Sequence, residues 1–147
     1  MAAALKGMAE LMRRLDALGK LEGANTLRSA VRAGMRPVLK QAVAEIPKSD
    51  AGHTIGKKRG GFQQYVAPGF AARNIAMQAF SLDGGRVGRA QLGVRKKAFY
   101  AVQFVERGTR YQRKQEWLVP ALDQTQDAAL EAVANYLRKA VDKAARK

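Results

Sequence analysis

The segment Tyr100-Ala-Val-Gln-Phe-Val-Glu-Arg-Gly-Thr109 decides how the rest of the chain is interpreted. Its periodicity is ambiguous, because apolar residues at 100, 102 and 104 alternate as in a strand, whereas those at 101, 104 and 105 recur as in a helix. We favour a short helix, since Gly108 can then adopt the left-handed conformation that commonly ends one.

Downstream of this segment, the sequence predicts a long C-terminal helix. Apolar residues recur at helical spacing from Val119 to Lys147, within a helical segment that we place at 115–147. Pro120 suits the first turn of a helix, and several bases lie near the C-terminal end, where cations interact favourably with the helix dipole.

Two more helices are expected near the N-terminus. Residues 1–20 carry apolar side chains at helical spacing, which is typical of an amphipathic helix. A second helix is predicted from about Asn25, a favourable N-cap, to Ile46, just before a proline. Pro37 lies inside it, and because proline removes a donor and clashes with the preceding turn at about 3 kcal/mol, we expect a kink near Ala33.

The middle of the chain predicts a short helix and a small sheet. Pro68 is in a helix-opening position, and residues 68–75 suit a short helix. Gly84-Gly85 predicts a turn between strands near 79–82 and 86–95, in a sheet of three or four strands at most. The expected fold is therefore a single α+β domain of helices packed around a small, mostly antiparallel sheet.

The charge of the chain is concentrated in this middle part. Residues 1–56 hold nine bases and five acids, residues 57–114 hold thirteen and two, and residues 115–147 hold five of each, within a net charge of +15. Residues 48–66 contain four glycines and no apolar period, so we expect a mobile basic loop there. Such a local excess favours contact with an anion over a general solubility role.

Two dense basic clusters are candidates for that contact. Lys57, Lys58 and Arg59 form the first cluster, and Arg95, Lys96 and Lys97 form the second. They could neutralise backbone phosphates without reading bases, which would give non-specific DNA binding that weakens with salt. The alternative is that they form only a solvated basic face.

Nothing in the sequence predicts an enzyme, a metal site or a bound cofactor. There is no cysteine and one histidine, His53, to which we assign no role. Asp83 and Glu106 are the only acids between residues 57 and 114, which leaves no carboxylate pair for acid-base chemistry or metal binding. Gly84-Gly-Arg-Val-Gly88 lacks the spacing of a phosphate-binding loop. No apolar run approaches the roughly 20 residues that cross a bilayer, so no membrane contact is expected.

Two motifs resemble the C-terminal signature of the HK97 gp10-like family of tailed-phage neck and tail-completion (minor tail) proteins. They are the pattern Tyr-Ala-x-x-Val-Glu-x-Gly-Thr at 100–109 and the aromatic-Leu-x-Pro-Ala box at 117–121, in which Trp117 takes a place that phenylalanine usually holds. Residues 70–75 are also similar to a Gly-x-Leu-Arg-x-Ser-Ile element of the family. The resemblance runs from about Leu27 to the C-terminus, with an insertion at 48–67.

The resemblance implies a structural virion protein at the head-tail connector or the head-proximal end of the tail. Such a protein would form a cyclic homo-oligomeric ring around the DNA channel and contact neighbouring connector, tail terminator or tail tube proteins. It would reside in the virion, and in the host cytoplasm during assembly, with genome DNA passing through non-specifically. The alternative function is that of a free-standing, non-specific basic nucleic-acid-binding protein.

The resemblance also singles out residues of a family core or subunit interface. For Glu106 two interpretations stay open, an intramolecular salt bridge and a contact across a subunit boundary. Trp117 is expected to anchor the C-terminal helix in the core, with an interface role as the alternative. The full set of candidates is Tyr100, Val105, Glu106, Gly108, Thr109, Trp117, Leu118 and Pro120.

Overall fold

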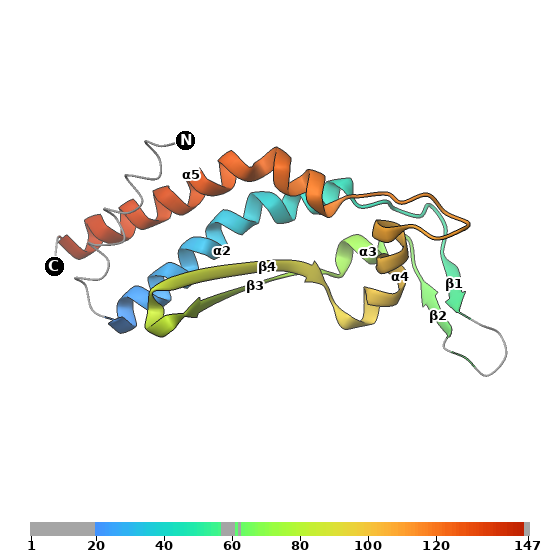
Figure 1. The fold of residues 1–147 in the computed structure, drawn as a ribbon, viewed down its shortest axis with the longest axis horizontal. Coiled ribbons are helices and arrows are strands. Elements are labelled where there is room, and N and C mark those ends of the chain that lie inside the picture. Colours follow the sequence, from blue (N-terminus) through green and yellow to red (C-terminus); the bar gives the residue numbers. More distant parts are fainter. Residues whose placement is uncertain (1–19, 57–60, 62, 146–147) are drawn as a thin grey trace. The chain divides into compact units, whose positions relative to one another are not determined.

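The computed structural model describes residues 20–56, 61 and 63–145 (Figure 1). Apart from Lys20, the predicted N-terminal helix of residues 1–20 lies outside the described residues, and so does the basic cluster at 57–59. Within the described part, no helix has the length and apolarity to cross a membrane. The elements are α2 (Lys20–Glu45), β1 (His53–Gly56), β2 (Gln63–Val66), α3 (Phe70–Arg73), β3 (Ile75–Leu82), the 3-10 turn η1 (Asp83–Gly85), β4 (Val87–Val94), α4 (Lys96–Arg107) and α5 (Leu118–Ala145).

These elements form two compact units. Of the described residues, unit 1 comprises 20–37, 77–91 and 126–145, and unit 2 comprises 38–56, 61, 63–76 and 92–125. The elements α2, β3, β4 and α5 each contribute residues to both units.

The packing of unit 1 depends on two glycines. A Cβ atom on Gly34 would fall well inside contact distance of the Val133 side chain and 2.9 Å from the Ala129 carbonyl oxygen, so the backbones of α2 and α5 approach closely there. A Cβ on Gly88 of β4 would lie 2.8 Å from Leu27 Cγ, which shows that β4 packs directly on α2. Larger residues at either glycine would force these elements apart.

Unit 2 has its own buried core. Val102 of α4 and Trp117, which directly precedes α5, are each 2% exposed. Trp117 was expected to anchor the C-terminal helix, and its side chain lies in this core. The core residues are Ala42, Ile46, Ile75, Ala98, Val102, Trp117 and Ala121.

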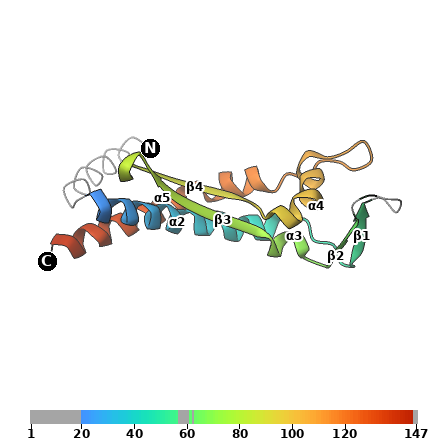
Figure 2. The same cartoon turned by 90° about the horizontal axis from the view of Figure 1, so that it is seen from below.

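The α+β class is confirmed, but the strands in the described part of the chain form two two-stranded sheets, and the expectation of one sheet was wrong. The strands β3 and β4 pair side by side across η1 (Figures 1 and 2), where Gly84 and Gly85 take φ angles of 60° and 93°. The strands β1 and β2 pair antiparallel, with His53 opposite Val66. Because α3 separates β2 from β3 in the chain, these neighbouring strands need not pair.

The β1–β2 hairpin lies within residues 48–66, where a mobile basic loop was expected. The sequence there lacks an apolar period, yet a two-stranded ladder needs only paired main-chain groups. A Cβ on Gly52 would lie 2.6 Å from Tyr65 Cζ, so glycine lets the aromatic ring cover the start of the hairpin. The mobility of this segment stays a prediction.

The described helices lie where the sequence predicted helices, but their first and last residues differ from the predicted ones. The helix α2 begins by Lys20, so Asn25 lies inside it and is not its N-cap; good helix formers such as Leu21 and Glu22 extend it. The helix continues through Pro37, and the predicted kink near Ala33 is not tested. The helices at 96–107 and 118–145 confirm two predictions, including Pro120 in the first turn of α5.

Candidate assembly interface

A set of hydrogen bonds closes the segment between α4 and α5, which we call the α4–α5 loop (residues 108–117). The Glu106 carboxylate oxygen Oε2 accepts a hydrogen bond from the Trp117 main-chain N–H, with 3.1 Å between the heavy atoms. One residue earlier, the Val105 carbonyl accepts from the Gln115 N–H at 2.8 Å. Glu106 thus satisfies a main-chain donor at the start of α5, a role that neither of the interpretations left open for it had included.

Gly108 and Thr109 shape the beginning of the same loop. Gly108 ends α4 with φ 74° and ψ 172°, so the positive φ was expected but the ψ is extended and not left-handed helical. A Cβ there would lie 2.8 Å from the Lys114 main-chain nitrogen. The Thr109 hydroxyl accepts hydrogen bonds from the N–H groups of Tyr111 (3.2 Å) and Gln112 (3.1 Å). The Val-Glu-x-Gly-Thr motif therefore builds a defined loop inside one chain.

A second network fixes the start of α4. The buried Asn74 side chain donates from Nδ2 to the Phe70 carbonyl at 2.7 Å, and the Asn74 carbonyl accepts from the Arg95 N–H at 2.8 Å. Arg73 donates to the Pro68 carbonyl at 2.8 Å. The matching residues of the 70–75 element thus join α3 to the residue that precedes α4.

The basic cluster Arg95, Lys96 and Lys97 lies at the N-terminus of α4, where all three side chains are exposed. Cations are unfavourable at this end of a helix, because the helix dipole is positive there. The first turn of α4 contains no acid to compensate them. Helix stability therefore does not account for these bases.

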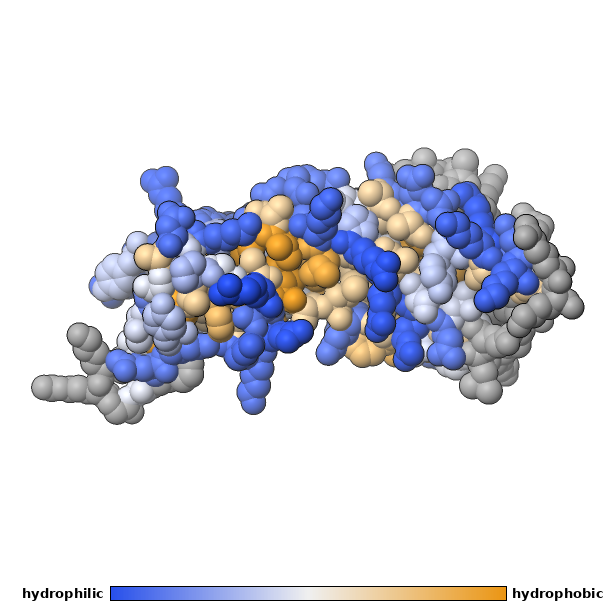
Figure 3. All heavy atoms as spheres, turned by 180° about the vertical axis from the view of Figure 1, so that it is seen from behind, coloured by the Kyte–Doolittle hydropathy of each residue, from blue (hydrophilic) through white to orange (hydrophobic). Residues whose placement is uncertain are grey.

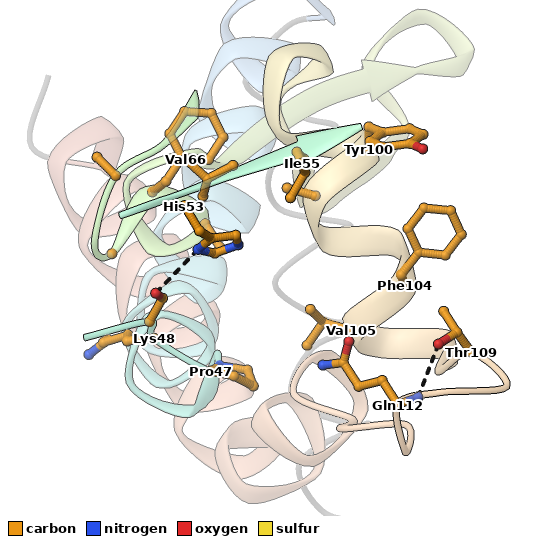
Figure 4. Close-up of a pocket in the computed structure, with 16 residues that line it drawn as sticks. Pro47, Lys48, His53, Ile55, Val66, Tyr100, Phe104, Val105, Thr109 and Gln112 are labelled. Carbon is orange, nitrogen blue, oxygen red and sulfur yellow. Dashed lines mark hydrogen bonds between the residues drawn. The ribbon is translucent and has the colours of Figure 1, made fainter. Parts of the chain in front are cut away.

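A pocket of about 450 Å³ lies between the β1–β2 hairpin, α3 and α4 (Figure 4). Tyr100, Phe104 and Val105 of α4 line one side of it, and Ile55 lines the other. His53 is also a lining residue, with Nδ1 3.5 Å from the Ser49 hydroxyl. No group of three or more metal-binding side chains occurs in the described part of the chain.

Exposed aromatic rings mark the α4 side of this pocket. Tyr100 is 42% exposed and Phe104 is 40% exposed, and their rings meet edge to face with 5.4 Å between centroids. In the α4–α5 loop, Tyr111 is 84% exposed and the Arg110 guanidinium lies 4.6 Å from its ring centroid. Neither Phe104 nor Tyr111 was predicted to be a site residue, although the i, i+4 spacing of 100 and 104 was a signal.

Charged groups around the loop are exposed as well. Lys114 Nζ lies 2.6 Å from Glu116 Oε1, and the hydrogen bond to this carboxylate raises the pKa of Lys114 above its ordinary value. Seen from behind, hydrophilic side chains dominate the surface and an apolar area interrupts them (Figure 3). Arg107 at the end of α4 and the loop residues Arg110 and Arg113 are exposed, so the surface near the pocket is both aromatic and basic.

The remaining predicted residues have varied environments. Val105, Leu118 and Pro120 are half-buried, whereas Thr109 is exposed. Leu118 packs against the core of unit 2. Among the signature side chains, Tyr100 and Thr109 are exposed and also line the pocket.

The fold and this surface define a small α+β module with an exposed aromatic and basic face. A family model described as "Bacteriophage HK97-gp10, putative tail-component" matches residues 9–108, more than half of the chain. The chain belongs to this HK97 gp10-like family of phage tail components. The match ends at Gly108, so the box at 117–121 lies beyond it. No curated protein and no solved structure matches the chain.

Proposed function

We propose that this tail component acts at the head-proximal end of the tail, as a neck or tail-completion subunit. Copies of the chain form a ring around the channel through which the genome passes. The ring contacts connector, tail terminator or tail tube proteins on either side. This proposal makes the chain a structural part and not an enzyme, present in the virion and, during assembly, in the host cytoplasm.

The exposed aromatic pair on α4 is the observation that carries the proposal. Aromatic residues and arginine are enriched at protein interfaces, and apolar side chains that adjoin one another on the surface often mark a site of interaction. Tyr100 and Phe104 lie on a helix that two hydrogen-bond networks hold at both ends, through Arg95 and Glu106. A rigid, pre-organised surface loses little conformational entropy when it binds a partner.

The basic residues support the position of DNA in this proposal. The bases at 95–97 are exposed at the end of α4 where the helix dipole disfavours them, and the 57–114 region holds thirteen bases against two acids. Bases that line a channel lower the repulsion between DNA and the protein wall without selecting any sequence. The same charge favours the second candidate, a free-standing nucleic-acid-binding protein, which does not account for the aromatic pair.

The test is to locate the protein in particles of a phage that carries the gene. Mass spectrometry of purified virions and of tail assembly intermediates should detect the chain in several copies per particle. Cryo-electron microscopy should then place it as a ring where the tail meets the head. A non-structural phage protein serves as the control for contamination. Absence of the chain from both virions and intermediates would contradict the proposal.

A further inference from the structure

We infer that the exposed face of α4, with the pocket beside it, receives the N-terminal half of α5 from a second copy of the chain. The inference rests on the proposed ring, and it identifies the two surfaces that join neighbouring subunits. The aromatic rings of the first surface and the apolar side chains of the second are both exposed in the single chain.

The receiving surface is a stripe on α4. Lys97, Tyr100, Phe104 and Arg107 follow one another at spacings of three, four and three residues, which places them on one face of the helix. The two aromatic rings lie in the middle of the stripe and a base lies at each end. Figure 4 shows the two rings projecting from α4 beside the pocket. The described residues that line the pocket include Lys48 and no Asp or Glu.

The incoming surface is the exposed side of α5 near its start. Val119 is 54% exposed and Leu122 is 48% exposed, although both are large apolar residues. Asp123 and Asp127 lie exposed beside them at i, i+4 spacing along the same helix. An apolar strip with acids along one edge matches an aromatic stripe with bases at its ends.

The distribution of charge along the chain favours this contact over most other contacts between two copies. The chain has a net charge of +15, so most contacts between two copies bring like charges together. Residues 115–137 form the longest stretch without a Lys or Arg, and they contain four acids. Contact between this stretch and the α4 stripe therefore turns repulsion into attraction.

The geometry of the contact also suits a ring. The α4 stripe and the α5 strip are different surfaces, so the contact is heterologous and each copy keeps one of each surface available for the next neighbour. Such a contact closes into a ring when the rotation between subunits allows it.

Cross-linking tests the contact directly, because the chain contains no cysteine. One gene copy carries Leu122→Cys and a second carries Phe104→Cys, and both are expressed during growth of the phage. After mild oxidation of isolated tails, we expect a disulfide-linked heterodimer at least about tenfold more abundant than for a control pair. The control joins Leu122→Cys with Gln78→Cys, since Gln78 is exposed on β3 and outside both surfaces.

The outcomes separate this inference from the proposed function. If both cysteine variants are present in tails and cross-link no more than the control pair, the inferred contact is wrong while the structural role stands. If the unaltered chain is absent from tails and tail intermediates, the proposed function itself is wrong.

Charge reversal provides a second, independent test. Two double variants reverse the charge on one surface each: Asp123→Lys with Asp127→Lys on α5, and Lys97→Glu with Arg107→Glu on α4. Either variant should lower incorporation into tails about tenfold, equal to ~1.4 kcal/mol per contact. A chain that carries all four changes should return to within about threefold of the native level, because its charges are complementary again. If the two double variants fold like the native chain but the variant with all four changes is incorporated into tails no more than either of them, the inferred contact is wrong.

Discussion

Glu106 and Trp117 are eleven residues apart, and a single hydrogen bond of 3.1 Å from the Trp117 main-chain N–H to the Glu106 carboxylate joins them. The bond ties the last turn of α4 to the residue that precedes α5. Carboxylates are favourable at the start of a helix, because they accept from unsatisfied N–H groups and interact well with the dipole. The glutamate therefore acts on the start of a helix that is remote in sequence.

Replacing Glu106 by alanine should destabilise the fold by about 1–2 kcal/mol, the usual loss when a helix-start acceptor is removed. Glu106→Gln keeps an oxygen acceptor without the charge, so its loss should be smaller. Urea unfolding followed by the fluorescence of Trp117, the only tryptophan, measures both. Equal stability of the alanine and native chains would show that the bond is dispensable.

Gly108→Ala should destabilise the chain by about 1–3 kcal/mol, because φ is 74° and the added Cβ would lie 2.8 Å from the Lys114 nitrogen. Gly93→Ala is the matched control, since a Cβ at Gly93 meets nothing within 4 Å. Thermal unfolding by circular dichroism compares the two variants. A loss at Gly93 as large as that at Gly108 would remove the local explanation.

Trp117→Ala should cost about 3–5 kcal/mol, since the side chain is 2% exposed in the core of unit 2. Trp117→Phe should cost only about 1–2 kcal/mol, because most of the buried ring area remains. Trp117 Nε1 donates to no other described residue, so phenylalanine loses no hydrogen bond within the described part of the chain. Circular dichroism melting measures both, and a phenylalanine variant as unstable as the alanine variant would contradict the prediction.

Gly34→Ala should destabilise unit 1 by about 1–3 kcal/mol, although alanine is the better helix former by about 1 kcal/mol. The added methyl group would meet Val133 and the Ala129 carbonyl where α2 and α5 approach each other. Combining it with Val133→Ala should recover part of the loss, since one of the two obstacles is then smaller. Additive effects in this double-mutant cycle would show that the two positions do not interact.

Purified protein should bind duplex DNA weakly, without sequence preference and with a strong dependence on salt. Changing Arg95, Lys96 and Lys97 to serine should reduce the slope of log K against log salt by about 0.9 for each phosphate that the variant no longer neutralises. Arg138→Ser with Lys139→Ser is the control, because these exposed bases lie in the charge-balanced C-terminal segment.

Fluorescence anisotropy over a salt series measures the slope. Sequence-specific binding in the nanomolar range at physiological salt would favour the free-standing nucleic-acid-binding protein over the channel subunit.

Local patterns were enough to predict the helices and the second hairpin. The spacing of apolar residues after Val119 predicts a helix because only a helix places them on one face. Gly84-Gly85 predicts a turn because glycine readily adopts positive φ angles, as both residues do in the structure. The motifs at 100–109 and 117–121 likewise indicated the family, and the predicted helices and strands indicated the α+β class. These features depend on residues close together in the chain.

Contacts between distant residues were decided by the tertiary structure alone. The hairpin at 53–66 depends on main-chain pairing that leaves no apolar period, and the bond from Trp117 to Glu106 exists only because the α4–α5 loop folds back on α4. The signature side chains also differ in burial, because Trp117 lies in the core whereas Tyr100 lies at the surface. The sequence by itself identified the signature residues. Packing in the tertiary structure determined which of them stabilise the fold and which lie exposed at the surface.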